Sequence, residues 1–193
     1  PATNVTYDNT TSGLAATDLQ AAVDEVYVSH ELRLDALEAK LSYVTTATID
    51  SQPALVLTGA NFHVRNSTGN TNNNNGQGNI IVGYQENRTE NGAVNFRTGS
   101  HNLIIGRGNN YNSCGGLCVG YRNTISGSYS TVAGGSNNTA SGQYSTCTGG
   151  GNNRASNTNS TVTGGNRCVA SGQYSSVAGG TFCTATATYS SAY

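Results

Sequence analysis

The feature that most constrains the fold is a short repeat of fixed period in the C-terminal half of the chain. Such a period indicates one small structural unit stacked on copies of itself, rather than a globular active-site fold. The unit is too small for a helix pair or a propeller blade, but it fits one coil of a β-solenoid. The glycines that mark the repeat recur at every fifteenth position: Gly134, Gly149, Gly164 and Gly179.

We therefore predict a mainly β chain, with a parallel β-solenoid or β-roll head over residues 79–193. Gly106, Gly120 and Gly134 recur at every fourteenth position, so the early coils are slightly shorter than the later ones. The remaining predicted segments are an extended lead-in (1–17), a helical neck (18–42), and a β-hairpin connector with a loop (43–78).

Each coil has two positions that we expect to point inward. Their small side chains predict a thin interior, so one roll buries little area and side-by-side packing in an oligomer is expected. Stacked Asn123, Asn138 and Asn153 are predicted to hydrogen-bond from coil to coil. The first inward position holds Cys118, Val132, Cys147, Val162 and Val177, and the second holds Ile125, Ala140, Ala155 and Ala170.

Residues 18–42 predict a helix that opens with a capping box from Thr17 to Gln20 and carries a narrow apolar stripe. A narrow stripe on a polar helix needs partner helices, so we predict a trimeric coiled coil; the alternative is a helix packed on its own domain. The predicted trimer core is Leu19, Val23, Val26, His30, Leu34, Leu37 and Leu41.

His30 is the polar member of this stripe. Three copies would converge on the axis, where imidazoles could bind an anion or a metal. The simpler interpretation is a polar core residue that sets the register, so no metal site is assigned.

In the connector, Tyr43, Thr45, Ala47 and Ile49 alternate as in a strand, and the following apolar segment predicts a hairpin that turns near Gly59. Residues 66–78 are predicted as a loop, and residues 85–99 as an insertion in the first coil.

The charge pattern argues against an enzyme. Charged residues are only 10% of the chain, and from Arg97 onward there are five Arg but no Asp or Glu. Hydrolase or lyase chemistry on a solenoid needs carboxylates, and only Asp50, Glu86 and Glu90 lie near its start. We predict no catalytic residues and no cofactor. Because the arginines are widely spread, no nucleic acid is expected, and no apolar run predicts membrane insertion.

The five cysteines are an odd number, so at least one is unpaired or intermolecular. Cys118 and Cys147 fall at inward positions and are interpreted as small buried side chains. Cys168 and Cys183 are separated by one full repeat and should stack on adjacent coils. They could form a disulfide in an oxidising compartment, but free thiols are the default expectation.

Tyrosine recurs at one repeat position and supplies the candidate ligand-binding residues: Tyr129, Tyr144, Tyr174 and Tyr189. Asn159 interrupts this series. Aromatic faces stack on sugars and amides bind hydroxyls, so an exposed tyrosine ladder could bind glycan. The favoured alternative is that the tyrosines pack between neighbouring rolls. The loop 66–78 and the insertion 85–99 are other candidate contact sites.

Two segments resemble known families. TTSGLAATDLQAAVDEV resembles a segment common in bacteriophage tail-fibre proteins, where it opens a trimeric coiled coil. The elements RTGSHN, GGL, NTISG and STVAGGSNNTASG resemble an uncharacterised family of bacterial surface proteins. The repeat resembles the heads of trimeric autotransporter adhesins, which are left-handed parallel β-rolls packed three at a time. Trimeric fibre adhesins of predatory bacteria combine a similar shaft and tip.

This chain departs from the repeat pattern of those families at Cys168, Cys183 and Asn157, and no segment of it resembles their membrane anchor. The resemblance implies a homotrimeric extracellular fibre tip, on a bacterial cell surface or a virion fibre, that recognises a host or prey cell-surface glycan or protein. The alternative is a structural fibre spacer without its own ligand. An ice- or crystal-surface binder is disfavoured because the repeated faces mix Ser, Thr, Tyr and Asn.

Overall fold

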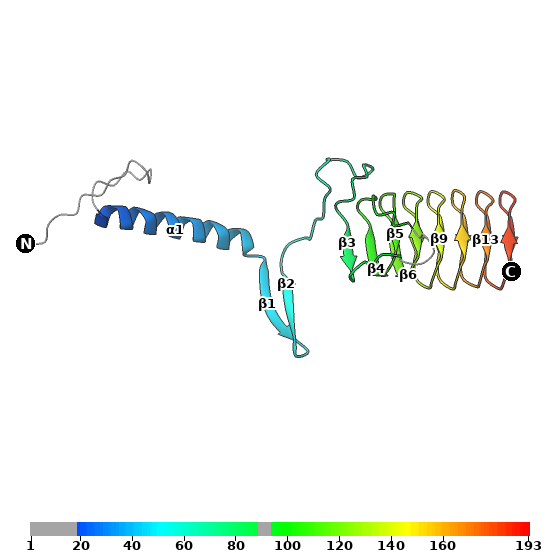
Figure 1. The fold of residues 1–193 in the computed structure, drawn as a ribbon, viewed down its shortest axis with the longest axis horizontal. Coiled ribbons are helices and arrows are strands. Elements are labelled where there is room, and N and C mark those ends of the chain that lie inside the picture. The colour runs from blue at the N-terminus through cyan, green and yellow to red at the C-terminus, as the bar shows by residue number, and fades with distance from the viewer. Residues whose placement is uncertain (1–18, 89–93) are drawn as a thin grey trace, which may run out of the picture. The chain divides into compact units, whose positions relative to one another are not determined.

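A computed structural model of the chain describes residues 19–88 and 94–193, which fall into two compact units divided between Phe62 and His63 (Figure 1). The predicted lead-in over residues 1–17, together with the Thr17 half of the capping box, lies outside the described residues.

Within residues 19–62, the first unit contains one helix and one hairpin. Helix α1 (Leu19–Leu41) has Lys40 in its last turn, where a cation interacts favourably with the helix dipole. The Gln20 side chain donates through Nε2 to Asp24 Oδ1 at 2.9 Å, one turn further on. Such pairs stabilise the helix surface only slightly, so α1 depends on burial of its apolar side chains.

The hairpin pairs β1 (Val44–Ile49) with β2 (Gln52–Leu57), from Val44 opposite Leu57 to Ile49 opposite Gln52. The prediction that it turns near Gly59 is wrong. The turn is Asp50–Ser51, whose φ angles of 49° and 65° suit the two-residue turns that match strand twist. Asp-Ser is not the usual Asp-Gly or Asn-Gly signature of such a turn, and this misdirected the sequence-based prediction.

The second unit confirms the parallel β-solenoid (Figure 1). Its coils stack in chain order from β3 to β16, and successive coils contribute strands to two parallel sheets. Among the described residues the first sheet has eight strands: β3 (Ile80–Val82), β4 (Leu103–Arg107), β6 (Leu117–Tyr121), β8 (Thr131–Val132), β10 (Thr146–Cys147), β12 (Thr161–Val162), β14 (Ser176–Val177) and β16 (Ser191–Ala192).

The second sheet runs along the other side of each coil and has six described strands. Each of these strands is short, because the coil turns again at once. They are β5 (Asn110–Tyr111), β7 (Thr124–Ile125), β9 (Thr139–Ala140), β11 (Arg154–Ala155), β13 (Val169–Ala170) and β15 (Thr184–Ala185).

The strand register shows how the coil length changes along the stack. Leu103 pairs with Leu117, and Leu117 pairs with Thr131, so equivalent residues of these early coils lie fourteen positions apart. Thr131 pairs with Thr146, fifteen positions further on. The predicted change of period is therefore confirmed. Ile80 pairs with Leu103, so the first coil is longer and contains the inserted residues.

The core is a thin column formed by the two predicted inward positions, and their burial is confirmed. Their side chains are at most 1% exposed, and Ile104 and Tyr111 extend the column toward the first coils. Because most of these side chains are Ala, Val or Cys, each coil buries little apolar area. Hydrophobic burial alone therefore gives a weak stack.

A buried column of asparagines supplies the missing stabilisation. This asparagine ladder consists of Asn109, Asn123, Asn138 and Asn153, each at most 1% exposed. The Asn138 backbone amide donates to Asn123 Oδ1 at 2.8 Å, and the Asn153 amide donates to Asn138 Oδ1 at 2.9 Å. The predicted coil-to-coil hydrogen bonding is confirmed.

The side-chain amide of a ladder asparagine also joins two coils. Asn138 Nδ2 donates to Gly134 O in its own coil at 3.1 Å and to Gly150 O in the next coil at 3.0 Å. Each such residue therefore satisfies backbone groups of neighbouring coils that would otherwise be buried without partners. An unpaired buried group of this kind costs about 1–3 kcal/mol.

The paired glycines of the repeat differ in what they tolerate, which gives a matched test of the coil spacing. A Cβ at Gly150 would lie 2.1 Å from Gly165 O, and Gly150 has a φ of 77°. A Cβ at Gly149 meets nothing within 4 Å. We expect Gly150→Ala to lower the free energy of unfolding by about 3 kcal/mol or more, from backbone strain and overpacking.

Gly149→Ala should change the free energy of unfolding by less than about 1 kcal/mol, in the stabilising direction. Urea denaturation followed by circular dichroism, at equal protein concentrations, measures both changes. Equal effects of the two substitutions would contradict the close approach of neighbouring coils at Gly150.

Candidate functional site

The four predicted ligand-binding tyrosines lie in one column at a corner of the solenoid, together with Asn159. We call this column the corner ladder: Tyr129, Tyr144, Asn159, Tyr174 and Tyr189. All five have φ between 56° and 59°, a left-handed conformation that is strained for a bulky residue. Sequence reasoning missed this conformation, although Asn159, and Gly115 at the equivalent place one coil earlier, both favour it.

Backbone hydrogen bonds between coils hold the corner ladder in this conformation. The Tyr144 amide donates to Ser128 O at 3.0 Å, and the Asn159 amide donates to Gln143 O at 3.0 Å. Each corner residue is therefore tied to the preceding coil through its own backbone. The backbone position of each corner residue is set by the stack.

The corner ladder is two stacked pairs rather than one continuous series. The ring centroids of Tyr129 and Tyr144 are 5.6 Å apart with planes at 10°, and those of Tyr174 and Tyr189 are 5.0 Å apart at 6°. These are offset-stacked distances. Asn159 separates the pairs and has no aromatic ring.

Exposure differs along the ladder. Tyr129 is 39% exposed, Tyr144 50%, Tyr174 45% and Tyr189 74%. The Tyr129 hydroxyl donates to Asn72 Oδ1 in the loop 66–78, so this hydroxyl is already hydrogen-bonded within the chain. The Tyr129 ring also covers Gly115. Tyr144 and Tyr174 are the more accessible of the internal tyrosines.

The opposite corner of the coil has a second column in the same left-handed conformation. The guanidinium of Arg122 lies 5.1 Å from the centroid of the Tyr121 ring, and that of Arg167 lies 5.4 Å from the Phe182 ring. These cations are therefore engaged with aromatic faces. The column, in which φ lies between 56° and 59°, consists of Arg122, Asn137, Asn152, Arg167 and Phe182.

The inserted first coil is fastened to the stack by arginine. Arg88 Nε donates to Gly108 O at 2.7 Å, and Arg88 Nη2 donates to Asn123 O at 2.6 Å. Partial burial lowers the pKa of Arg88 from its ordinary value, but the guanidinium remains charged. Arg107 pairs with Glu86 at 3.7 Å. These contacts give the basic residues near the insertion a structural role.

The loop 66–78 contributes to a polar pocket that sequence reasoning did not find. His63 and His101, which have no apparent partners in the sequence, both line it, although they are far apart along the chain. His101 Nδ1 lies 3.1 Å from Thr71 O. The lining residues are His63, Val64, Arg65, Asn66, Ser67, Gly69, Asn70, Thr71 and His101.

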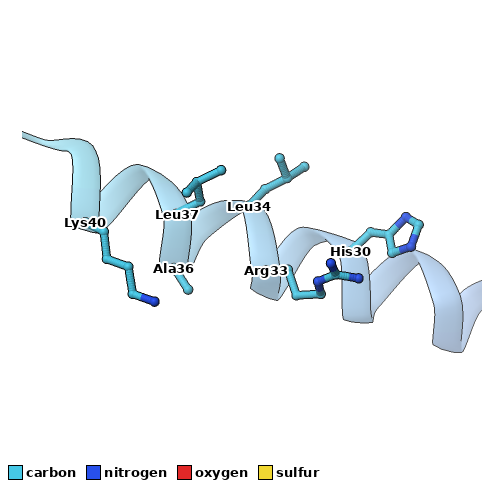
Figure 2. A pocket seen from close by; sticks show the side chains of 6 residues that line it. All are labelled: His30, Arg33, Leu34, Ala36, Leu37 and Lys40. Carbon is cyan, nitrogen blue, oxygen red and sulfur yellow. The ribbon is translucent and has the colours of Figure 1, made fainter. Parts of the chain in front are cut away.

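On the helix, the predicted trimer-core residues are exposed to solvent in the single chain. Figure 2 shows Leu34 and Leu37 pointing away from Arg33, Ala36 and Lys40. The apolar residues of the stripe are 39–54% exposed, and His30 is exposed as well. Tyr27, Val28 and Leu32 are further exposed apolar residues that lie outside the predicted stripe.

All five cysteines are free thiols, including the stacked pair Cys168 and Cys183. Burial raises the pKa of Cys118 to about 12 and that of Cys147 to about 11. The pKa of Cys183 is also raised, by desolvation and by the neighbouring Cys168. Cys168 and Cys183 occupy the asparagine-ladder position on the last coils, where the Cys168 amide donates to Asn153 Oδ1.

Within residues 19–88 and 94–193, no group of three or more His, Cys, Asp or Glu side chains is placed to hold a metal ion. Over the same residues, no helix has the length and apolar character needed to cross a membrane. Comparison of the chain with protein-family models, curated proteins and solved structures gives no match.

The burial of the thiols predicts their order of reaction. At about pH 8, buried thiols with raised pKa values react slowly because the thiolate is the nucleophile. Cys183 is half-buried, whereas the other four are buried. We expect a disulfide reagent to modify Cys183 first in the folded protein, and Cys183→Ser to abolish this phase. Fast modification of Cys118 or Cys147 would contradict the buried core.

Proposed function

We propose that the chain forms a homotrimeric extracellular fibre tip. In this proposal α1 is one strand of a trimeric coiled coil, and the solenoids are left-handed β-rolls packed three at a time. The trimer functions as an adhesin or receptor-binding head on a bacterial cell surface or a virion fibre. Its ligand is a host or prey cell-surface structure, and we propose a glycan.

The observation that carries this proposal is the exposed apolar stripe of α1. Leu34 is 50% exposed and Leu37 53%, and their stripe runs the length of α1, which also exposes Tyr27, Val28 and Leu32 outside the stripe. A helix stabilised mainly by packing needs a surface against which to bury such a stripe. The stripes of identical helices supply such a surface to one another through knobs-into-holes packing.

The hairpin of the first unit supports the same proposal. Leu55 in β2 is 76% exposed and Ile49 in β1 is 52% exposed. A two-stranded hairpin is marginally stable in water by itself. Three copies of a helix and hairpin can bury in one another the apolar side chains that a single copy leaves exposed.

The head supports recognition rather than catalysis. From Arg97 onward the chain has no Asp or Glu, so this part of the solenoid lacks the carboxylates used in glycoside hydrolysis. Its corner ladder instead presents stacked aromatic rings with neutral polar neighbours, a surface suited to sugars. Three heads on one fibre would combine weak sites into strong attachment.

A purely structural spacer is the second candidate, and the contacts of Tyr129 favour it. This tyrosine stacks on Tyr144 and donates its hydroxyl to Asn72, so it joins a loop to the coils without any ligand. Stacked tyrosines can stabilise a solenoid without binding a ligand. On this alternative the fibre binds its target elsewhere.

One set of variants tests the assembly and the binding together. The double variant Leu34→Asp, Leu37→Asp places charge in the seam, and we expect the light-scattering mass to fall from three chains to one. Leu32→Asp makes the same change at a 64% exposed leucine outside the stripe and should leave the trimer intact.

Binding of each variant to a glycan array and to whole cells then tests the function. We expect the trimer to bind a glycan, and the monomeric variant to bind at least about 100-fold more weakly because avidity is lost. A monomeric unmodified chain would contradict the trimer. A trimer that binds neither glycans nor cells would support the spacer.

A further inference from the structure

We propose that the interruption of the corner ladder at Asn159 is a binding slot for one neutral pyranose ring, held between the faces of Tyr144 and Tyr174. This inference rests on the proposed function and names the place and the ligand class within it. We call the space between the rings of Tyr144 and Tyr174, on the solvent side of Asn159, the pyranose slot.

The spacing of the coils fixes the width of the slot. Rings one coil apart have centroids 5.6 Å and 5.0 Å apart in the two stacked pairs. Tyr144 and Tyr174 are two coils apart, and neighbouring strands lie about 4.8 Å from each other, so these rings lie about 10 Å apart. Stacked rings have centroids about 4.5–7 Å apart, so one flat ring fits between them and two do not.

The ring faces that line the slot are the ones left uncovered. Tyr129 stacks on one face of Tyr144, and Tyr189 stacks on one face of Tyr174. Their other faces point toward the coil of Asn159. That residue is only half-buried, and its amide is too short to cover a tyrosine ring. Tyr144 and Tyr174 remain 50% and 45% exposed accordingly.

The chemistry of the slot suits an uncharged sugar. A pyranose ring has faces of C–H groups that stack on aromatic rings, and hydroxyls that need hydrogen-bond partners. The side-chain amide of Asn159 offers both a hydrogen-bond donor and an acceptor at the base of the slot. Gln143 and Gln173, the exposed residues before the two tyrosines, add neutral amides at the rim. The corner ladder itself has no charged residue.

The slot is also preorganised, because coil-to-coil hydrogen bonds fix the backbone of its walls and base, and stacking on Tyr129 and Tyr189 orients the rings of its walls. The backbone amide of Asn159 donates to Gln143 O at 3.0 Å, and the backbone amide of Tyr174 donates to Thr158 O at 3.1 Å. Ser160 Oγ donates to Asn157 O at 2.7 Å in the same corner. A ligand therefore enters without ordering a loop, which avoids a common cost of binding.

Asn159→Tyr tests the inference because it fills the slot with a residue that the adjacent coils already carry in the same backbone conformation. Tyrosine already occupies φ of 57° and 58° on the adjacent coils, and Asn159 has φ 56°. The control is Asn152→Tyr, the same substitution at φ 58° in the opposite corner column. Asn159→Ala removes the amide but leaves the slot open.

The probes are neutral methyl pyranosides of glucose, galactose, mannose and N-acetylglucosamine, together with an array of their oligosaccharides. Isothermal titration calorimetry measures the affinity for each pyranoside, and tyrosine fluorescence, to which four ladder tyrosines of the eleven in the chain contribute, gives a second signal. We expect Asn159→Tyr to weaken binding at least about tenfold, and Asn152→Tyr to leave it unchanged. Asn159→Ala should weaken it less than Asn159→Tyr.

The possible outcomes separate the slot from the proposed function. If the unmodified chain binds a pyranoside and Asn159→Tyr binds it equally well, the slot is wrong while glycan recognition stands. If the unmodified chain binds no saccharide, glycan recognition fails and the slot fails with it. If Asn159→Tyr changes the light-scattering mass of the assembly, the ladder is a contact between chains, which also overturns the slot.

Discussion

The hydrogen bonds between successive coils are the interaction on which the rest of the solenoid depends. The core column is made mainly of Ala, Val and Cys, so hydrophobic burial in each coil is small. The asparagine ladder compensates, because one side chain such as Asn138 accepts from the next coil and donates to two carbonyls. Removing one member leaves several buried groups of neighbouring coils unpaired.

The same hydrogen bonds determine the surface. Since every coil rises by one strand spacing, each corner residue lies directly over its equivalent in the preceding coil. The corner residues are held in a left-handed conformation by backbone hydrogen bonds between coils, such as the one that the Tyr144 amide donates to Ser128 O. A change of residue in the column therefore alters the surface without altering the backbone. Asn159 among the tyrosines is such a change.

Periodicity made the solenoid, its inward positions and its asparagine ladder predictable, because each depends on equivalent residues in every coil. Features that depend on one local conformation were not predictable in this way. The hairpin turns at Asp50–Ser51 instead of near Gly59 because two non-glycine residues adopt positive φ. The pocket that brings His63 and His101 together depends on an irregular loop with no repeat to indicate its path. The apolar stripe of α1 was visible in the sequence. Its packing against two further copies of the helix in a trimer remains a prediction.

Amide hydrogen exchange on the intact chain, resolved by residue, tests the central claim most directly. The amides of Asn138, Asn153 and Cys168 donate to buried asparagine oxygens. We predict that they exchange only through cooperative unfolding of the stack, far more slowly than amides of the loop 66–78. Exchange of these amides as fast as that of the loop would show that the asparagine ladder does not hold the coils together.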